Sequence, residues 1–162
     1  APSMSPSMDI QVSSNFERAL YLAYGGDAGA IAQLMEELRS GGFTVSQGAL
    51  QALRAQYVSG RVGEEETLAT IRTIRAETGQ ILCPHSAVGV AVARHHAEPG
   101  VPMVTLATAH PAKFPDAVEK AVGIRPALPP HMAGLFDLPE RVTRVENDTA
   151  ALEALILERR TI

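Results

Sequence analysis

Apolar residues recur every three or four positions through most of this chain, which is the spacing of one face of an α-helix. The pattern predicts helices over residues 14–24, 27–39, 46–57, 64–78, 86–96 and 114–122, and a last helix beyond residue 148. Glycines follow several of these segments, as they do where helices end. We therefore expect a mostly helical protein.

Residues at the predicted helix starts match the preferences of helix N-termini. Ser14 and Glu17 have the spacing of a capping box. Cys83 stands in the N-cap position before Pro84, a residue favoured at the first helical position. Three further helices are expected to begin at Asp27, Ser46 and Asp148. Residues 1–13 carry proline and serine and are interpreted as an extended lead-in.

Residues 102–107 interrupt the helical pattern with a nearly continuous apolar run. Such a run is typical of a strand buried on both faces of a parallel sheet. Residues 142–145 are a second, short candidate strand. A single strand cannot satisfy its own backbone hydrogen bonds. We therefore expect the rest of the sheet to lie outside this chain, the chain to be truncated, and the exposed strand to promote self-association.

Composition and charge narrow the class of protein. The 162 residues are 46% hydrophobic and 20% charged, with a net charge of −4. No apolar run approaches the roughly 18 residues of a membrane helix, and no basic cluster suggests nucleic-acid binding. The single cysteine, Cys83, excludes an internal disulfide and fits a reducing cytoplasm. No cysteine or histidine spacing predicts a metal site.

Two places hold candidate binding residues. Thr108 follows the predicted strand, and the carboxyl ends of parallel strands are where such sheets place ligands. Its hydroxyl is either a hydrogen-bond partner for a heteroaromatic nitrogen or an ordinary turn group. Ser14, Asn15 and Arg18 lie at a helix start, which is either an anion site or a simple capping box. Cys83 is either a nucleophile, because a thiol pKa tends to fall at a helix N-terminus, or a structural residue in the N-cap position.

Three segments resemble one known family. They read MSPSMDIQVSSNFER at residues 4–18, CPHSAVG at 83–89 and TAHPAKF at 108–114. Together they closely resemble the threonine synthases of the bacterial and fungal type, and the resemblance covers essentially the whole chain as their carboxyl-terminal portion. Cys83 stands where the family usually has an acidic residue.

The resemblance implies a carboxyl-terminal fragment of a fold-type II α/β enzyme that depends on pyridoxal phosphate. Such an enzyme is a carbon–oxygen lyase that acts on phosphate, converting O-phospho-L-homoserine and water into L-threonine and phosphate. It implies that Thr108 is the partner of the pyridine nitrogen, and that Ser14, Asn15 and Arg18 contact substrate. The family's Schiff-base lysine lies in an amino-terminal motif that this chain lacks, and Lys113 and Lys120 stand in other contexts.

These implications give a specific set of expectations. The fragment holds no catalytic residue of its own, binds no cofactor alone and is inactive alone. Residues 1–80 are a helical segment of the large catalytic domain, and residues 81–162 are an α/β segment that completes the cofactor domain and adds the C-terminal helix. The alternatives are a non-catalytic helical binding or scaffold module of the same descent, and another fold-type II lyase.

Overall fold

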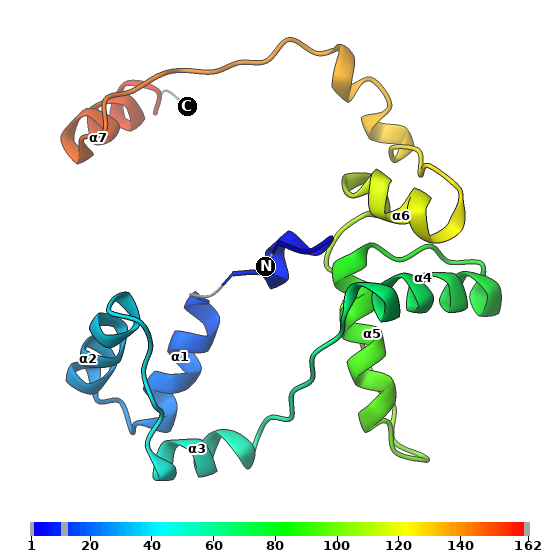
Figure 1. The fold of residues 1–162 in the computed structure, drawn as a ribbon. Helices are drawn as coiled ribbons and strands as arrows, with labels where there is room; N and C mark the ends of the chain where they lie inside the picture. The colour runs from blue at the N-terminus through cyan, green and yellow to red at the C-terminus, as the bar shows by residue number, and fades with distance from the viewer. Residues whose placement is uncertain (1, 11–12, 161–162) are drawn as a thin grey trace. The chain divides into compact units, whose positions relative to one another are not determined.

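The computed structural model describes residues 2–10 and 13–160, and these form seven α-helices and four short 3-10 turns (Figure 1). The helices are α1 (Ser14–Ala23), α2 (Ala28–Arg39), α3 (Gln47–Arg54), α4 (Glu64–Thr78), α5 (Pro84–His96), α6 (Pro115–Val122) and α7 (Thr149–Glu158). The turns are η1 (Pro6–Met8), η2 (Pro111–Lys113), η3 (Pro130–Met132) and η4 (Leu135–Asp137). The chain divides into two compact units, Ala1–Ala127 and Leu128–Ile162.

Helices α1, α2 and α3 pack around a small apolar core. Leu20, Ile31 and Leu34 are buried there, and partly buried neighbours such as Phe43 cover them. The backbone N–H of Ser46 donates to the Tyr24 hydroxyl at 2.9 Å, which ties the start of α3 to the end of α1. The apolar residues that recur at helical spacing in the sequence thus form the buried faces of these helices.

Helices α4, α5 and α6 form a second group with its own core. Leu68 and Ile71 of α4 meet Ala87 of α5 and Ala121 of α6, and Ile71 is fully buried. Alanines at these contacts let the helix backbones approach closely, since they add little side-chain volume. The Arg75 guanidinium donates to the Val122 carbonyl at 3.0 Å and fastens α4 to the end of α6.

Most of the predicted helix ends are confirmed. The side chains of Asp27, Ser46, Cys83 and Asp148 each accept a hydrogen bond from a backbone N–H of the helix that follows. Gly79 ends α4 in the left-handed conformation, with φ 75°. The capping box at Ser14 is wrong. Ser14 is already helical, and Ser13 before it makes no side-chain cap bond.

The extended lead-in is also wrong where the structure describes it. Residues 3–9 fold into a closed loop around η1, because the Asp9 carboxylate accepts from both the N–H and the hydroxyl of Ser3, each at 2.8 Å. Ser5 is only 4% exposed within this loop. Residues 1, 11 and 12 of the predicted lead-in lie outside the described residues.

The predicted strands do not form in the part of the chain that the structure describes. Residues 102–107 and 142–145 contain neither helix nor strand. The physical reason is that a strand needs a neighbouring strand to take its backbone hydrogen bonds. Self-association through an exposed strand therefore has no support here, although Val104 and Leu106 are 79% and 76% exposed.

The unit Leu128–Ile162 holds η3, η4 and α7. Its helix α7 leaves Leu152, Ile156 and Leu157 largely exposed. The prediction that residues 1–80 and 81–162 are separate segments of a larger enzyme stays a prediction. In the structure, α4 and α5 lie on either side of that boundary and pack together.

Candidate functional site

The start of α5 carries a short chain of polar groups. The Cys83 sulfur accepts a hydrogen bond from the Ser86 N–H at 3.4 Å and lies 3.2 Å from the Ser86 hydroxyl oxygen. Ser86 Oγ in turn accepts from the Thr108 N–H at 3.1 Å and lies 3.4 Å from Thr108 Oγ1. Cys83 and Ser86 are buried, whereas Thr108 is exposed.

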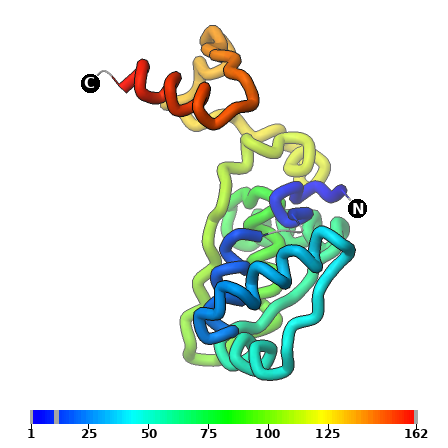
Figure 2. The backbone as a smooth tube through the Cα atoms, turned by 90° about the vertical axis from the view of Figure 1, so that its left-hand side faces the viewer, coloured from blue at the N-terminus to red at the C-terminus, as the bar shows by residue number. Residues whose placement is uncertain are grey.

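Thr108 reaches this place because the chain turns back after α5. Gly100, with φ 80°, makes the turn, and the following segment runs back alongside the helix (Figure 2). Thr105 lies against Gly89, where an added Cβ would come within 3.2 Å of the threonine methyl group. Thr108 lies three residues after Thr105, Ser86 lies three residues before Gly89, and these two residues are hydrogen-bonded to each other. The glycine therefore allows the close approach that sets the position of Thr108.

The bonding pattern defines what the Thr108 hydroxyl can do. Ser86 Oγ uses one lone pair on the Thr108 N–H, and its own O–H can donate to Cys83 Sγ or to Thr108 Oγ1. When Ser86 donates to Thr108, the Thr108 O–H is left as a donor toward an outside acceptor. Ser86 is not among the site residues predicted from the sequence, and its only sequence signal is its place three residues after the predicted N-cap.

Replacing Ser86 with alanine is expected to loosen Thr108. The Thr108 amide loses its acceptor, and its exchange with solvent should rise about 2- to 12-fold for a hydrogen bond with a net worth of about 0.5–1.5 kcal/mol. Amide exchange measured by NMR checks this. Ser40→Ala is the matched control, because that hydroxyl bonds only the Glu36 carbonyl of α2. Unchanged exchange at Thr108 in Ser86→Ala would contradict the arrangement.

The other predicted residues lie at the start of α1. Ser14, Asn15 and Arg18 are all exposed. Ser14 and Arg18 line a depression of about 510 Å³ between α1 and α2, together with Glu17. In the described part of the chain, no side-chain hydrogen bond or ion pair joins these three residues to Ser86 or Thr108, so the structure does not bring the two predicted places together by direct contact.

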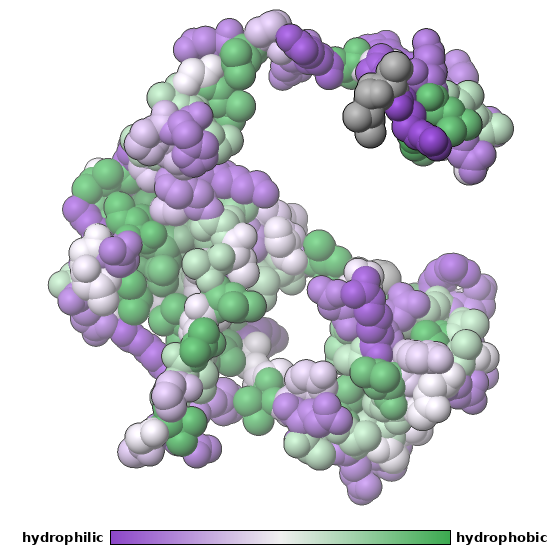
Figure 3. Space-filling model, turned by 180° about the vertical axis from the view of Figure 1, so that it is seen from behind, coloured by the Kyte–Doolittle hydropathy of each residue, from purple (hydrophilic) through white to green (hydrophobic). Residues whose placement is uncertain are grey.

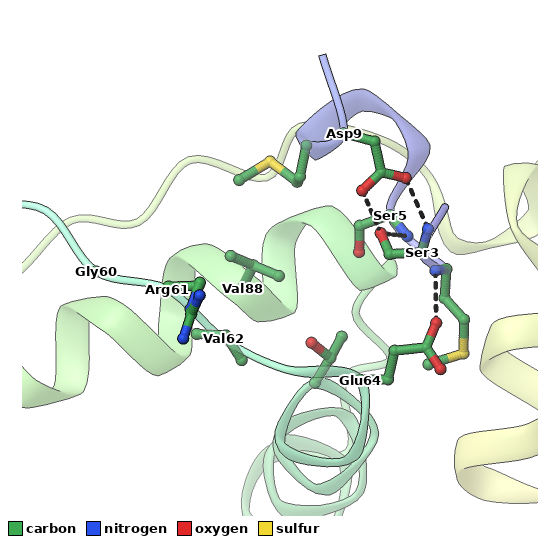
Figure 4. A pocket seen from close by; sticks show the side chains of 11 residues that line it. Ser3, Ser5, Asp9, Gly60, Arg61, Val62, Glu64 and Val88 are labelled. Carbon is green, nitrogen blue, oxygen red and sulfur yellow. Dashed lines mark hydrogen bonds between the residues drawn. The ribbon is translucent and has the colours of Figure 1, made fainter. Parts of the chain in front are cut away.

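A third feature lies where the loop of residues 3–9 meets α4 and α5. A cavity of about 330 Å³ is lined there by loop residues and by residues of α4, α5 and the segment before α4 (Figure 4). The Met4 N–H donates to the Glu64 carboxylate at 3.1 Å, and the Ser7 N–H donates to His85 Nε2 at 3.0 Å. The hydrogen bonds from Ser3 hold the pKa of Asp9 below its usual value. Sequence patterns gave no signal for these long-range contacts.

The described residues contain no group of three or more His, Cys, Asp or Glu side chains placed to hold a metal ion. None of the helices in these residues has the length and apolar character needed to cross a membrane.

Comparison with known proteins gives a consistent result. The family profile described as "Threonine synthase, C-terminal" matches residues 86–156. A threonine synthase of Pseudomonas aeruginosa is 46% identical over 158 residues, covering 96% of this chain and 34% of the relative.

Solved structures agree with the sequence relatives. The pyridoxal phosphate-bound threonine synthase from Brucella melitensis superposes with a TM-score of 0.81 at 48% identity, over 98% of this chain and 34% of that one. The yeast threonine synthase gives a TM-score of 0.77 at 31% identity, over 98% and 36%. The chain thus spans about a third of the length of the relatives it matches.

Proposed function

We propose, on the premise that this chain belongs to the threonine synthase family, that it forms the carboxyl-terminal part of an enzyme converting O-phospho-L-homoserine and water into L-threonine and phosphate. The proposal includes pyridoxal phosphate as cofactor and a cytoplasmic location. The observation that carries it is the hydrogen-bonded placement of Thr108 against Ser86, because this placement suits the role that the resemblance implies for Thr108.

The residues at the start of α5 fit the cofactor's ring nitrogen. Pyridoxal phosphate, when bound, supplies a ring that withdraws electrons from the substrate. The Thr108 hydroxyl is a neutral donor on an exposed residue, and Ser86 fixes the backbone that carries it. A neutral donor leaves the ring nitrogen largely unprotonated, in contrast to a carboxylate partner. Thr108 would therefore moderate the electron withdrawal and orient the ring.

The start of α1 suits the phosphate of the substrate. The first N–H groups of a helix have no partner within the helix, and Ser13 makes no side-chain bond to them. Arg18 can bind phosphate through two parallel hydrogen bonds, and Ser14 and Asn15 add short polar groups. Glu17 lines the same depression and opposes an anion, so Arg18 is the residue on which binding depends most.

Neither lysine of the chain suits the tethering role. Lys113 Nζ lies 5.7 Å from the centre of the Phe114 ring, and Lys120 is exposed in the last turn of α6. We expect the tethering lysine to come from a part of the enzyme beyond these 162 residues, so that the chain alone neither binds the cofactor covalently nor turns over substrate. We also expect residues 102–107 to become a strand once neighbouring strands of that enzyme are present.

The function is tested with the full-length protein that contains this chain. With pyridoxal phosphate and O-phospho-L-homoserine, phosphate and L-threonine should appear in equal amounts. Phosphate release with another amino-acid product would favour another fold-type II lyase, and neither product would favour a scaffold module. The 162-residue chain alone, mixed with pyridoxal phosphate and reduced with borohydride, should show no stoichiometric adduct by mass. Stoichiometric labelling of Lys113 or Lys120 would overturn the assignment of the lysine.

A further inference from the structure

The loop of residues 3–9 is docked through its backbone onto side chains of α4 and α5. Two of its N–H groups donate outward: Met4 to Glu64 of α4, and Ser7 to His85 of α5. Inside the loop, Ser3 and Asp9 close the ring with two hydrogen bonds (Figure 4). The docking therefore depends on two outside acceptors, of which His85 is the one that titrates near neutral pH.

His85 can accept the Ser7 N–H only while its ring is neutral. A protonated imidazole carries hydrogen on both nitrogens and has no lone pair left to accept with. The hydrogen bond to Nε2 also fixes the tautomer, since it places the ring proton on Nδ1. Among the described residues, Nδ1 is buried and has no hydrogen-bond partner.

The surroundings of His85 disfavour the charged ring. The residue is only 7% exposed, and its ring lies 4.4 Å from the Phe114 ring, centre to centre, at 51°. Two charged groups act on it, Lys113 from η2 and Asp9 from the loop itself. Burial, and secondly the Lys113 charge, lower the pKa of His85 from its ordinary value of 6.5, while Asp9 acts in the opposite direction.

We infer that His85 is a positioning residue whose neutral ring fastens the loop of residues 3–9 to α5, and that protonation of this ring releases the loop and opens the cavity beside it. The loop provides one wall of that cavity through Ser3, Met4, Ser5, Met8 and Asp9. Asp9 also lies only five residues before Ser14 along the chain. The protonation state of His85 therefore controls whether the loop of residues 3–9, which precedes α1 in the chain, is held against α5. This consequence goes beyond the proposed reaction.

The direction of the pH effect follows from the lowered pKa. The docked state favours the neutral ring, so docking is at full strength above 6.5, the ordinary pKa. Docking weakens as the pH falls below that value and through the lower pKa of the docked state, because the released state then binds the proton more readily.

An NMR titration of the full chain between pH 8 and pH 5 tests the inference. The Ser7 amide should titrate with the same midpoint as the His85 ring, and that midpoint should lie below 6.5. Exchange protection of the Ser7 amide, corrected for the intrinsic effect of pH, should fall about 2- to 12-fold across the transition for the loss of one hydrogen bond. Val118, buried in α6, reports whether the fold itself survives the acid.

Variants separate the loop contact from general acid effects. His85→Gln keeps a neutral acceptor, so the Ser7 transition should disappear, whereas His131→Gln alters an exposed histidine and should leave it intact. A Ser7 amide that stays constant while His85 titrates would overturn the inference, and so would a His85 midpoint at or above 6.5. If His85→Gln does not fold, the titration of the unmodified chain decides by the same two criteria.

Discussion

Replacing Thr108 with alanine is expected to lower kcat/KM of the full-length enzyme about 5- to 140-fold. In the role proposed for Thr108, the change leaves the cofactor's ring nitrogen without its donor, and an unpaired buried polar group costs about 1–3 kcal/mol. The stability of the fold should change little, because Thr108 is exposed and its link to Ser86 runs through its backbone N–H, which alanine keeps. Steady-state kinetics and an unfolding midpoint, measured on the same preparation, check both parts.

Two companion variants sharpen this prediction. Thr108→Ser keeps a hydroxyl at the same position and should recover most of the lost turnover. Thr44→Ala removes an exposed threonine of the α2–α3 connection and should leave kinetics as they were. An unchanged rate in Thr108→Ala would remove the role assigned to its hydroxyl, while the assignment to the family would stand on the sequence matches.

Replacing Ile71 with alanine is expected to destabilise the α4–α6 group by about 2–5 kcal/mol, the usual cost of truncating a large buried aliphatic side chain. Ile71 is fully buried and touches the residues that join the three helices. Its loss removes apolar burial and leaves a cavity in a core whose other buried residues are Leu68, Ala87 and Ala121. Native-state hydrogen exchange of the α4 amides measures the effect within this group.

The chain offers a matched control for that truncation. Ile156 of α7 is 57% exposed, and the same change there should cost well below 1 kcal/mol, because little apolar surface is taken out of contact. Equal losses at the two positions would contradict the assignment of Ile71 to the core. Apolar side chains are visible at many places on the surface (Figure 3), so burial and not residue type decides the result.

Helix positions could be predicted from the sequence because they depend on local chemistry. Asp27, Ser46 and Asp148 cap their helices through groups three residues away, a distance that spacing alone reveals. The prediction of a cap at Ser14 is wrong. The capping-box pattern was present, but the helix begins one residue earlier than a cap at Ser14 requires.

The predicted strand at residues 102–107 is wrong for a different reason. The apolar character of residues 102–107 is a property of the sequence, whereas a strand is a property of a pair of segments. The described residues offer no partner, and the segment instead runs beside α5 through Thr105 and Gly89. The sequence pattern therefore identifies a segment that suits a β-sheet, but it does not determine whether that segment pairs with another strand.

Residues close together along the chain account for the helical character, most helix ends and the motifs shared with the threonine synthases, so these features can be predicted from the amino-acid sequence. The contact of Ser86 with Thr108 and the contact of His85 with the loop of residues 3–9 arise only in the folded chain. These contacts span 22 and 78 residues. They exist because helix packing brings distant polar groups within hydrogen-bonding distance, and no local pattern encodes that distance.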